Sequence, residues 1–336
     1  MWLPTSLAAT LAVAGTIGEV LRSRRDDGAG EAPRLAFGGG APAIAARLRG
    51  LRTRSSATAT GTAVAFIHVP KCGGMSVDRA LRSALGVTGR DGWIDPRISR
   101  DSARGHLGEG VPEQAVPRML VLRRYLLAHY LTEGRRVVSG HGPVSEWILD
   151  RFAGRTPFVT LLRHPVERWI SYYTASRLAS EDPNIRPNRL SGLPLARELE
   201  ETLRSPTGAY IASLGAIYLG GHVPYGDEDP LDAVEGAVAS LRRFAVVGFS
   251  ADWADFARQC RRHLGIAVRV PHLNATSSYG QTRLQASLSS LFTPEVRERI
   301  THLCRADLAI YEAARQARAG LGTGPAGPPH RRREPG

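Results

Sequence analysis

Residues 63–69 read AVAFIHV, and a short loop and a helical pattern follow them. The seven residues form an apolar run that contains β-branched side chains, which predicts a buried strand. Residues 75–85 carry apolar side chains at helical spacing, which predicts a helix. The loop between the two consists of Pro70, Lys71, Cys72, Gly73 and Gly74. A strand, a glycine loop and a helix in this order are typical of an α/β fold.

Three further apolar runs predict strands at residues 137–138, 157–162 and 244–249. Helical patterns are expected at residues 166–177, 253–264 and 294–315. Strands that alternate with helices predict an α/β domain with a central, mostly parallel sheet flanked by helices. Ligands bind such sheets at the carboxyl ends of the strands. We therefore expect Lys71, His141 and Arg163, which each follow a predicted strand, to lie at one edge and form one pocket.

The chain contains one lysine, Lys71; every other member of its 44 strongly basic residues is arginine. Lysine is a compact point charge, whereas arginine spreads its charge over a planar group that does not lose its proton. A single lysine inside the one glycine loop that follows a buried strand is a candidate for a role that arginine cannot perform. The alternative is a surface lysine in an ordinary strand–turn–helix unit.

The loop is suited to bind a phosphate or a sulfonate. Its glycines allow backbone N–H groups to approach an anion, and the start of the helix contributes about half a positive charge. Lys71 adds a full charge, and Ser76 adds a hydroxyl donor. The lysine precedes both glycines, so the loop is not the GxxxxGK[ST] loop of ATPases. A nucleotide kinase is disfavoured for this reason, and because no convincing magnesium-binding carboxylate follows a strand.

Residues 161–173 (LLRHPVERWISYY) form a second motif. Arg163 at a strand end and Ser171 two helical turns later are candidates to hold one phosphate together, because arginine offers a bidentate donor. A structural role for this pair is an equal alternative. Trp169, Tyr172 and Tyr173 are expected in the core, with a platform for a cofactor as the alternative. Arg168 is expected to face solvent or to pair with Glu167.

The two motifs together resemble a family. The loop PKCGGMS is similar to the PKTGGTS-type loop of sulfotransferases that use 3′-phosphoadenosine 5′-phosphosulfate (PAPS), and RHPVERWISYY resembles their RDPVERFxSxY segment. The SGH between them matches in order as well. The resemblance is to the carbohydrate branch that includes heparan sulfate 2-O- and 6-O-sulfotransferases and bacterial relatives. It covers most of residues 63–315, loosely outside the motifs, and implies a P-loop-like, three-layer domain.

The resemblance implies a role for each matching position. The 5′-phosphosulfate would be held by Lys71, Cys72, Gly73, Gly74, Met75 and Ser76. The 3′-phosphate would be held by Arg163 and Ser171. A polar loop that closes over the cofactor would contain Asn274, Thr276 and Ser278. The chain departs from the family pattern at Cys72 and Met75, where threonines are common, and at His164, which replaces an aspartate. A role for Cys72 as a nucleophile is disfavoured, because this transfer needs no covalent enzyme intermediate.

Sulfuryl transfer to a hydroxyl needs a base for the proton and a cation for the leaving phosphate oxygen. We expect His141 to be the base, since the family's catalytic histidine lies in comparable segments, and Lys71 to stabilise the leaving group. A structural histidine at the strand end is the alternative, and Glu146 is a secondary candidate for the base. No metal is expected. The formal charge of +13 favours an anionic partner, and the expected acceptor bears hydroxyls, as a sugar or glycan does.

Two other functions stay open at this point. The chain could bind PAPS or a nucleotide without transferring anything, as the departures at Cys72, Met75 and His164 suggest. It could also be a basic nucleic-acid-binding protein, but no recognised motif of that class is present and no nucleic acid partner is expected. Acceptor-binding loops are expected in the irregular residues 86–135 and 178–230.

The ends of the chain are expected to lie outside the sulfotransferase domain, which we assign to residues 61–318. Residues 1–60 are predicted to be a flexible basic arm and residues 319–336 a disordered basic tail. Residues 1–20 match neither a membrane span nor a secretory signal well, although an anchor there stays possible. The widely spaced cysteines Cys72, Cys260 and Cys304 exclude a disulfide-rich scaffold and favour the cytoplasm.

Overall fold

The computed structural model describes residues 63–107, 112–180, 194–269 and 287–321. All of these belong to one compact unit that begins at Ala63, and residues 1–62 lie outside the described residues. The predicted arm therefore cannot be compared with the structure. The predicted tail can be compared only at residues 319–321, which continue the last helix.

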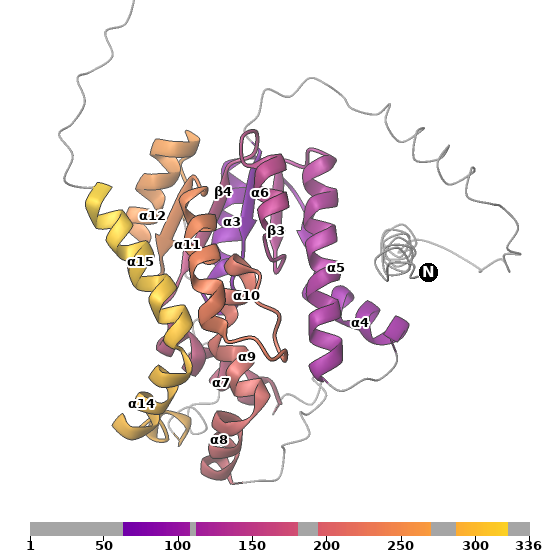
Figure 1. Cartoon of the computed structure of the whole chain (residues 1–336). Helices are drawn as coiled ribbons and strands as arrows, with labels where there is room; N and C mark the ends of the chain where they lie inside the picture. The colour runs from indigo at the N-terminus through magenta and orange to yellow at the C-terminus, as the bar shows by residue number, and fades with distance from the viewer. Residues whose placement is uncertain (1–62, 108–111, 181–193, 270–286, 322–336) are drawn as a thin grey trace, which may run out of the picture. The chain divides into compact units, whose positions relative to one another are not determined.

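A five-stranded parallel sheet forms the centre of the unit (Figure 1). Its strands, in spatial order, are β2 (Trp93–Ile94), β3 (Val137–Gly140), β1 (Val64–Ile67), β4 (Phe158–Leu162) and β5 (Val246–Phe249). Every neighbouring pair is parallel. The predicted α/β fold with a parallel sheet is confirmed. Four strands lie where the apolar runs predicted them, and the two-residue strand β2 is an addition that no periodicity could indicate.

Helices connect the strands and flank the sheet (Figure 1). They are α3 (Gly74–Ala84), α4 (Pro96–Leu107), α5 (Pro112–Thr132), α6 (Glu146–Phe152), α7 (Pro165–Ser180), α8 (Leu195–Arg204), α9 (Pro206–Ala212), α10 (Leu214–Gly220), η2 (Pro230–Ala233), α11 (Val234–Arg242), α12 (Trp253–Gln259), η3 (Cys260–Leu264), α14 (Pro294–Leu303) and α15 (Arg305–Leu321). Within these ranges no helix is long and apolar enough to cross a membrane.

Two predictions about helices are wrong. Residues 86–135 and 178–230 are not mainly irregular, because α4, α5, α8, α9 and α10 lie in them. The expected helix 294–315 is two helices, α14 and α15, which meet at Cys304. The prediction of a helix over 253–264 is confirmed, with a change from α-helix to a π-helical turn at Cys260.

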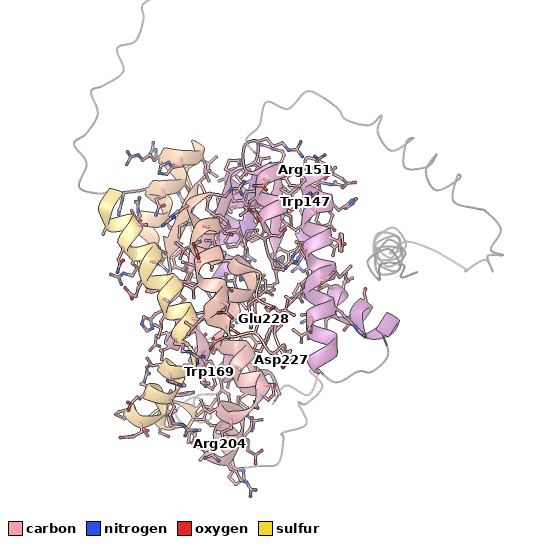
Figure 2. The ribbon with its side chains drawn as sticks, viewed as in Figure 1. Trp147, Arg151, Trp169, Arg204, Asp227 and Glu228 are labelled. Atoms are coloured by element: carbon pink, nitrogen blue, oxygen red, sulfur yellow. The ribbon has the colours of Figure 1, made fainter. Side chains whose placement is uncertain are left out.

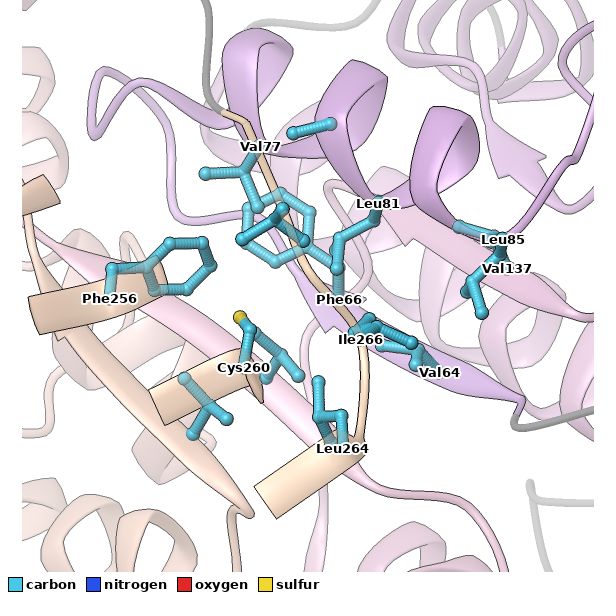
Figure 3. Packing of buried hydrophobic residues seen from close by; sticks show 14 of the residues in the cluster. Val64, Phe66, Val77, Leu81, Leu85, Val137, Phe256, Cys260, Leu264 and Ile266 are labelled. Atoms are coloured by element: carbon cyan, nitrogen blue, oxygen red, sulfur yellow. The ribbon is translucent and has the colours of Figure 1, made fainter. Parts of the chain in front are cut away.

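The core on one face of the sheet joins β1, β4 and β5 to α3 and α12 (Figure 3). Phe66 projects from the central strand against Val77 and Leu81 of α3, and Phe256 of α12 fills the other side of the cluster. Each such fully buried side chain stabilises the fold by roughly 1.5–3 kcal/mol. This packing fixes α3 against the strand from which its loop emerges, and so holds the loop rigidly.

A second core forms where α7, α8, α9 and α14 meet. Trp169, which is labelled in Figure 2, is fully buried there and donates a hydrogen bond from Nε1 to the Gly208 carbonyl (3.1 Å). Its ring stacks on that of Tyr173 at a centroid distance of 5.7 Å. The prediction that Trp169 and Tyr173 belong to the core is confirmed, whereas Tyr172 is only partly buried against it.

Candidate functional site

The three strand ends singled out by the sequence lie side by side. The register places Ile67 of β1 opposite Gly140 of β3 and Thr160 of β4. The loops that follow these strands are joined by hydrogen bonds. The His68 amide donates to the Gly140 carbonyl (3.1 Å), and Arg163 Nη1 donates to the Lys71 carbonyl (3.5 Å). The structure therefore brings Lys71, His141 and Arg163 to one edge of the sheet, as predicted.

The loop after β1 turns through two left-handed residues. Lys71 has φ 65° and Gly73 has φ 84°. Glycine adopts this conformation without penalty, but a residue with a side chain is strained by about 1–3 kcal/mol and is typically held so at functional sites. Gly73 is the N-cap of α3 and provides no capping side chain. Left-handed turns of this kind, at an uncapped helix start, point backbone N–H groups toward an anion.

The glycines of the loop are also required by close packing. A Cβ at Gly73 would lie 2.8 Å from Cη2 of Trp253, and a Cβ at Gly74 would lie 1.9 Å from Cδ2 of His68. The indole ring of Trp253 and the imidazole ring of His68 therefore leave no room for a side chain at Gly73 and Gly74. The sequence showed the glycines but not the side chains that need them.

The remaining loop residues differ in exposure. Cys72 is buried, its Sγ lies 3.8 Å from the Pro70 carbonyl oxygen, and burial raises the pKa of its thiol to about 11. A thiol that stays protonated is a poor nucleophile, which agrees with its interpretation as a small loop residue. Ser76 is buried in the first turn of α3, whereas the Met75 side chain is exposed.

His141 is held in one orientation. Its Nδ1 lies 2.8 Å from the main-chain oxygen of His68. Because a carbonyl oxygen only accepts, Nδ1 carries the hydrogen and Nε2 keeps its lone pair. Burial, and then the nearby Arg123 guanidinium, lower the pKa of His141 to about 3, although the hydrogen bond to His68 opposes the shift. The imidazole is therefore neutral at pH 7, with Nε2 able to accept a proton.

The charge of this site comes from Lys71 and Arg163, because His68 and His141 are neutral at pH 7. Burial lowers the pKa of Lys71, and Arg163 lowers it further. The Asp307 carboxylate lines the pocket beside Arg163 but is paired with Arg168. No carboxylate among the described residues forms an ion pair with Lys71 or Arg163. Two such cations, with Lys71 partly withdrawn from water, make an environment in which an anion is stabilised.

Arg163 and Ser171 are less closely associated than the sequence suggested. Arg163 lines a small pocket with Cys72, Pro165 and Tyr311. Ser171 lies six residues beyond Pro165 on α7, which is roughly 9 Å along the helix axis. The two side chains are not hydrogen-bonded to each other, and their joint role stays a prediction. The weaker candidates Asn274, Thr276 and Ser278 lie outside the described residues.

Arg168 does not behave as predicted. It is only 3% exposed, its Nη1 is paired with the Asp307 carboxylate, and its Nη2 donates to the main-chain oxygens of Ile211 (3.0 Å) and Ala212 (2.9 Å). Asp307 also accepts from the amide of Ala216 (2.9 Å), near the start of α10. Glu167, the expected partner, is instead paired with Arg297 at 2.7 Å.

Two residues beside His141 were not expected from the sequence. Arg123 of α5 is buried and donates from Nη1 to the hydroxyl of Tyr218 (3.3 Å). The Tyr218 ring lies edge-on to that of His141 at a centroid distance of 6.1 Å. No motif surrounds either residue, so only the three-dimensional fold reveals them. Glu146, the secondary candidate for the base, is exposed in the first turn of α6.

No protein-family model matches the chain, and a search of curated proteins found no match. Within the described ranges, no three His, Cys, Asp or Glu side chains gather as ligands for a metal ion. The assignment of a function therefore depends on the two motifs and on the geometry of the site.

Proposed function

We propose that the protein is a sulfotransferase that moves a sulfuryl group from PAPS to a hydroxyl of a carbohydrate-type acceptor. The observation that carries the proposal is the pair of cations at the carboxyl edge of the sheet, Lys71 and Arg163, which form no ion pair with a carboxylate of the described residues. Lys71 has a left-handed conformation beside the start of α3. Such a site favours a ligand with several negative charges, and PAPS carries a phosphosulfate and a phosphate.

The residues present fit this ligand. The Lys71 ammonium and the N–H groups at the start of α3 would hold the 5′-phosphosulfate. Arg163, and with it Ser171, would hold the 3′-phosphate, for which a guanidinium is well suited. The arrangement is P-loop-like in the sense that a loop between a strand and a helix holds the phosphate, although its sequence is not GxxxxGK[ST].

The chemistry assigns a task to two of these residues. When bound, PAPS supplies a sulfuryl group: the acceptor oxygen bonds to sulfur, the bond from sulfur to the phosphate oxygen breaks, and 3′-phosphoadenosine 5′-phosphate is released. His141 Nε2 takes the proton of the acceptor hydroxyl, since Nδ1 is already committed to the His68 carbonyl. The positive charge of Lys71 stabilises the negative charge that develops on the leaving phosphate oxygen.

The pKa of about 3 for His141 is low for a general base at neutral pH. Nearby negative charge raises the pKa of a histidine, because it favours the protonated form. His141 is therefore expected to become an efficient base only when the neighbouring loop holds an anion. This dependence would discourage proton abstraction in the absence of the sulfuryl donor.

Binding of 3′-phosphoadenosine 5′-phosphate, measured by calorimetry, tests the proposal. Micromolar binding to the wild type is expected, and Lys71→Ala should weaken it at least about tenfold, which is about 1.4 kcal/mol. Arg297→Ala is the matched control, because it also removes one positive charge but from an exposed ion pair with Glu167. Absence of binding by folded wild-type protein would contradict the proposal.

Binding of the nucleotide without transfer is the second candidate function, and the low pKa of His141 is the observation that favours it. The two functions differ in turnover with PAPS labelled in its sulfuryl group. A sulfotransferase passes the label to members of a panel of unsulfated polysaccharides and glycosides, and His141→Ala abolishes transfer while leaving nucleotide affinity intact. A binding protein shows the affinity and no transfer, in the wild type as in the variant.

A further inference from the structure

The side chain of His68 is a buried titratable group to which the proposed mechanism gives no task. It is only 5% exposed, and its Nδ1 is buried without a hydrogen-bond partner. A buried polar atom left without a partner costs free energy, of the order of 1–3 kcal/mol. An apolar side chain would avoid this cost at the end of a buried strand. The position of the ring therefore calls for an explanation.

One edge of the His68 ring lies against the phosphate loop. A Cβ at Gly74 would lie 1.9 Å from Cδ2 and 2.0 Å from Nε2 of the ring, so the imidazole occupies all the room beside the first residue of α3. The ring also stacks on Phe66, one layer deeper in the core, at a centroid distance of 5.6 Å. The ring is thus clamped between the core and the start of α3.

The same ring also contacts the candidate base. The ring centroids of His68 and His141 are 4.3 Å apart, with 31° between the ring planes. The main-chain oxygen of His68 accepts the hydrogen bond from Nδ1 of His141 (2.8 Å). A single residue therefore supplies both the acceptor that selects the tautomer of His141 and the surface on which its ring rests.

We propose that the His68 ring is a positioning residue: packed against both Gly74 and the ring of His141, it holds His141 with Nδ1 on the His68 carbonyl and Nε2 free to take the proton. The role in catalysis rests on the proposed function, whereas the control of the tautomer does not.

Removal of the His68 ring should allow the His141 side chain to change its orientation. Without the His68 ring packed against it, the His141 imidazole can rotate about Cβ–Cγ and leave the carbonyl, and the tautomer protonated on Nε2 becomes populated. The other groups beside His141 are Arg123 from α5 and Tyr218 from α10, and the substitution leaves both unchanged. A change in His141 can then be attributed to the missing ring.

Nitrogen-15 NMR of the histidine side chains tests the proposal without any substrate, because the two tautomers have different ring-nitrogen shifts. The wild type should show His141 protonated on Nδ1 alone. His68→Ala should give a mixture of tautomers, while His68→Phe, which keeps an aromatic surface, should retain the single tautomer. His263→Ala is the control, since His263 is exposed on η3. An unchanged tautomer in His68→Ala overturns the proposal.

Kinetics and binding separate this proposal from the proposed function. His68→Ala should lower kcat by about tenfold or more, and change affinity for 3′-phosphoadenosine 5′-phosphate less than twofold, because a positioned base contributes roughly 10²–10⁴-fold to rate. If His68→Ala does not fold, His68→Leu keeps the bulk without the aromatic face and should behave alike.

If the nucleotide does not bind the wild type but the tautomer depends on His68, only the proposed function fails. If the nucleotide binds and the tautomer does not depend on His68, only the positioning role fails.

Discussion

Two groups of basic side chains, one buried and one half-buried, differ in their counter-charges. Arg168, deep between α7, α10 and α15, is matched by the Asp307 carboxylate. Lys71 and the neutral His141, at the edge of the sheet, form the unmatched group, because only other bases lie near enough to shift their pKa. A buried charge that serves the fold is matched by an opposite charge, because the cost of removing it from water is otherwise not offset. The unmatched charge of Lys71 therefore supports the proposed anion site.

A further matched arginine supports the comparison. Arg82 of α3 pairs with Asp78 at 2.9 Å and donates to the hydroxyl of Ser139 (2.8 Å) and to the Asp91 carbonyl (2.7 Å). These bonds tie α3 to β3 and to the turn before β2. Both matched arginines thus connect elements that are distant in sequence, which is a structural role.

The largest expected effect is on stability, and it follows from breaking the ion pair between Arg168 and Asp307. Arg168→Ala leaves the Asp307 carboxylate buried without its partner, so the free energy of unfolding should fall by about 3–5 kcal/mol. Arg297→Ala, which removes an exposed partner of Glu167, should cost at most about 1 kcal/mol. Denaturant unfolding of the two variants measures both. Equal stability of Arg168→Ala and the wild type would remove the distinction between the groups.

The second effect is a dependence of stability on pH that arises in the unmatched group. The pKa of His141 is about 3 in the folded protein and about 6.5 when unfolded, so the unfolded chain binds more protons between these values. Stability should therefore fall as the pH decreases from 8 to 5, by roughly 2 kcal/mol from this residue. The slope of unfolding free energy against pH should be smaller in His141→Ala. An identical slope would show that His141 is not held neutral.

More of the fold than of the candidate site could be predicted from the sequence. Apolar runs located four strands, and the rule on parallel strand ends placed Lys71, His141 and Arg163 together. Helix α5 was missed because its apolar residues follow no single stripe, and because Pro117 lies inside it. The partner of Arg168 lies 139 residues away, beyond the reach of any local pattern. Local sequence thus indicates which residues follow the strand ends, but not which charges are neutralised.

The third effect separates strain from charge at Lys71. Lys71→Ala removes the charge but keeps a side chain at φ 65°, whereas Lys71→Gly removes both the charge and the strain. The glycine variant should exceed the alanine variant in unfolding free energy by about 1 kcal/mol, because glycine tolerates this conformation. Thermal unfolding at neutral pH measures the difference. A glycine variant less stable than the alanine variant would contradict a strained loop.

The most direct test of the comparison is thermal unfolding of the wild type and Lys71→Ala, each with and without 3′-phosphoadenosine 5′-phosphate. A ligand at 100 times its Kd should stabilise the wild type by about 2.7 kcal/mol. Lys71→Ala should be no less stable than the wild type without the nucleotide, and at the same nucleotide concentration should gain about 1.4 kcal/mol or less, as a tenfold or greater loss of affinity implies. The account is contradicted if the nucleotide does not stabilise the wild type and Lys71→Ala is as unstable as Arg168→Ala. Lys71 would then serve the fold, and its loop would not be an anion site.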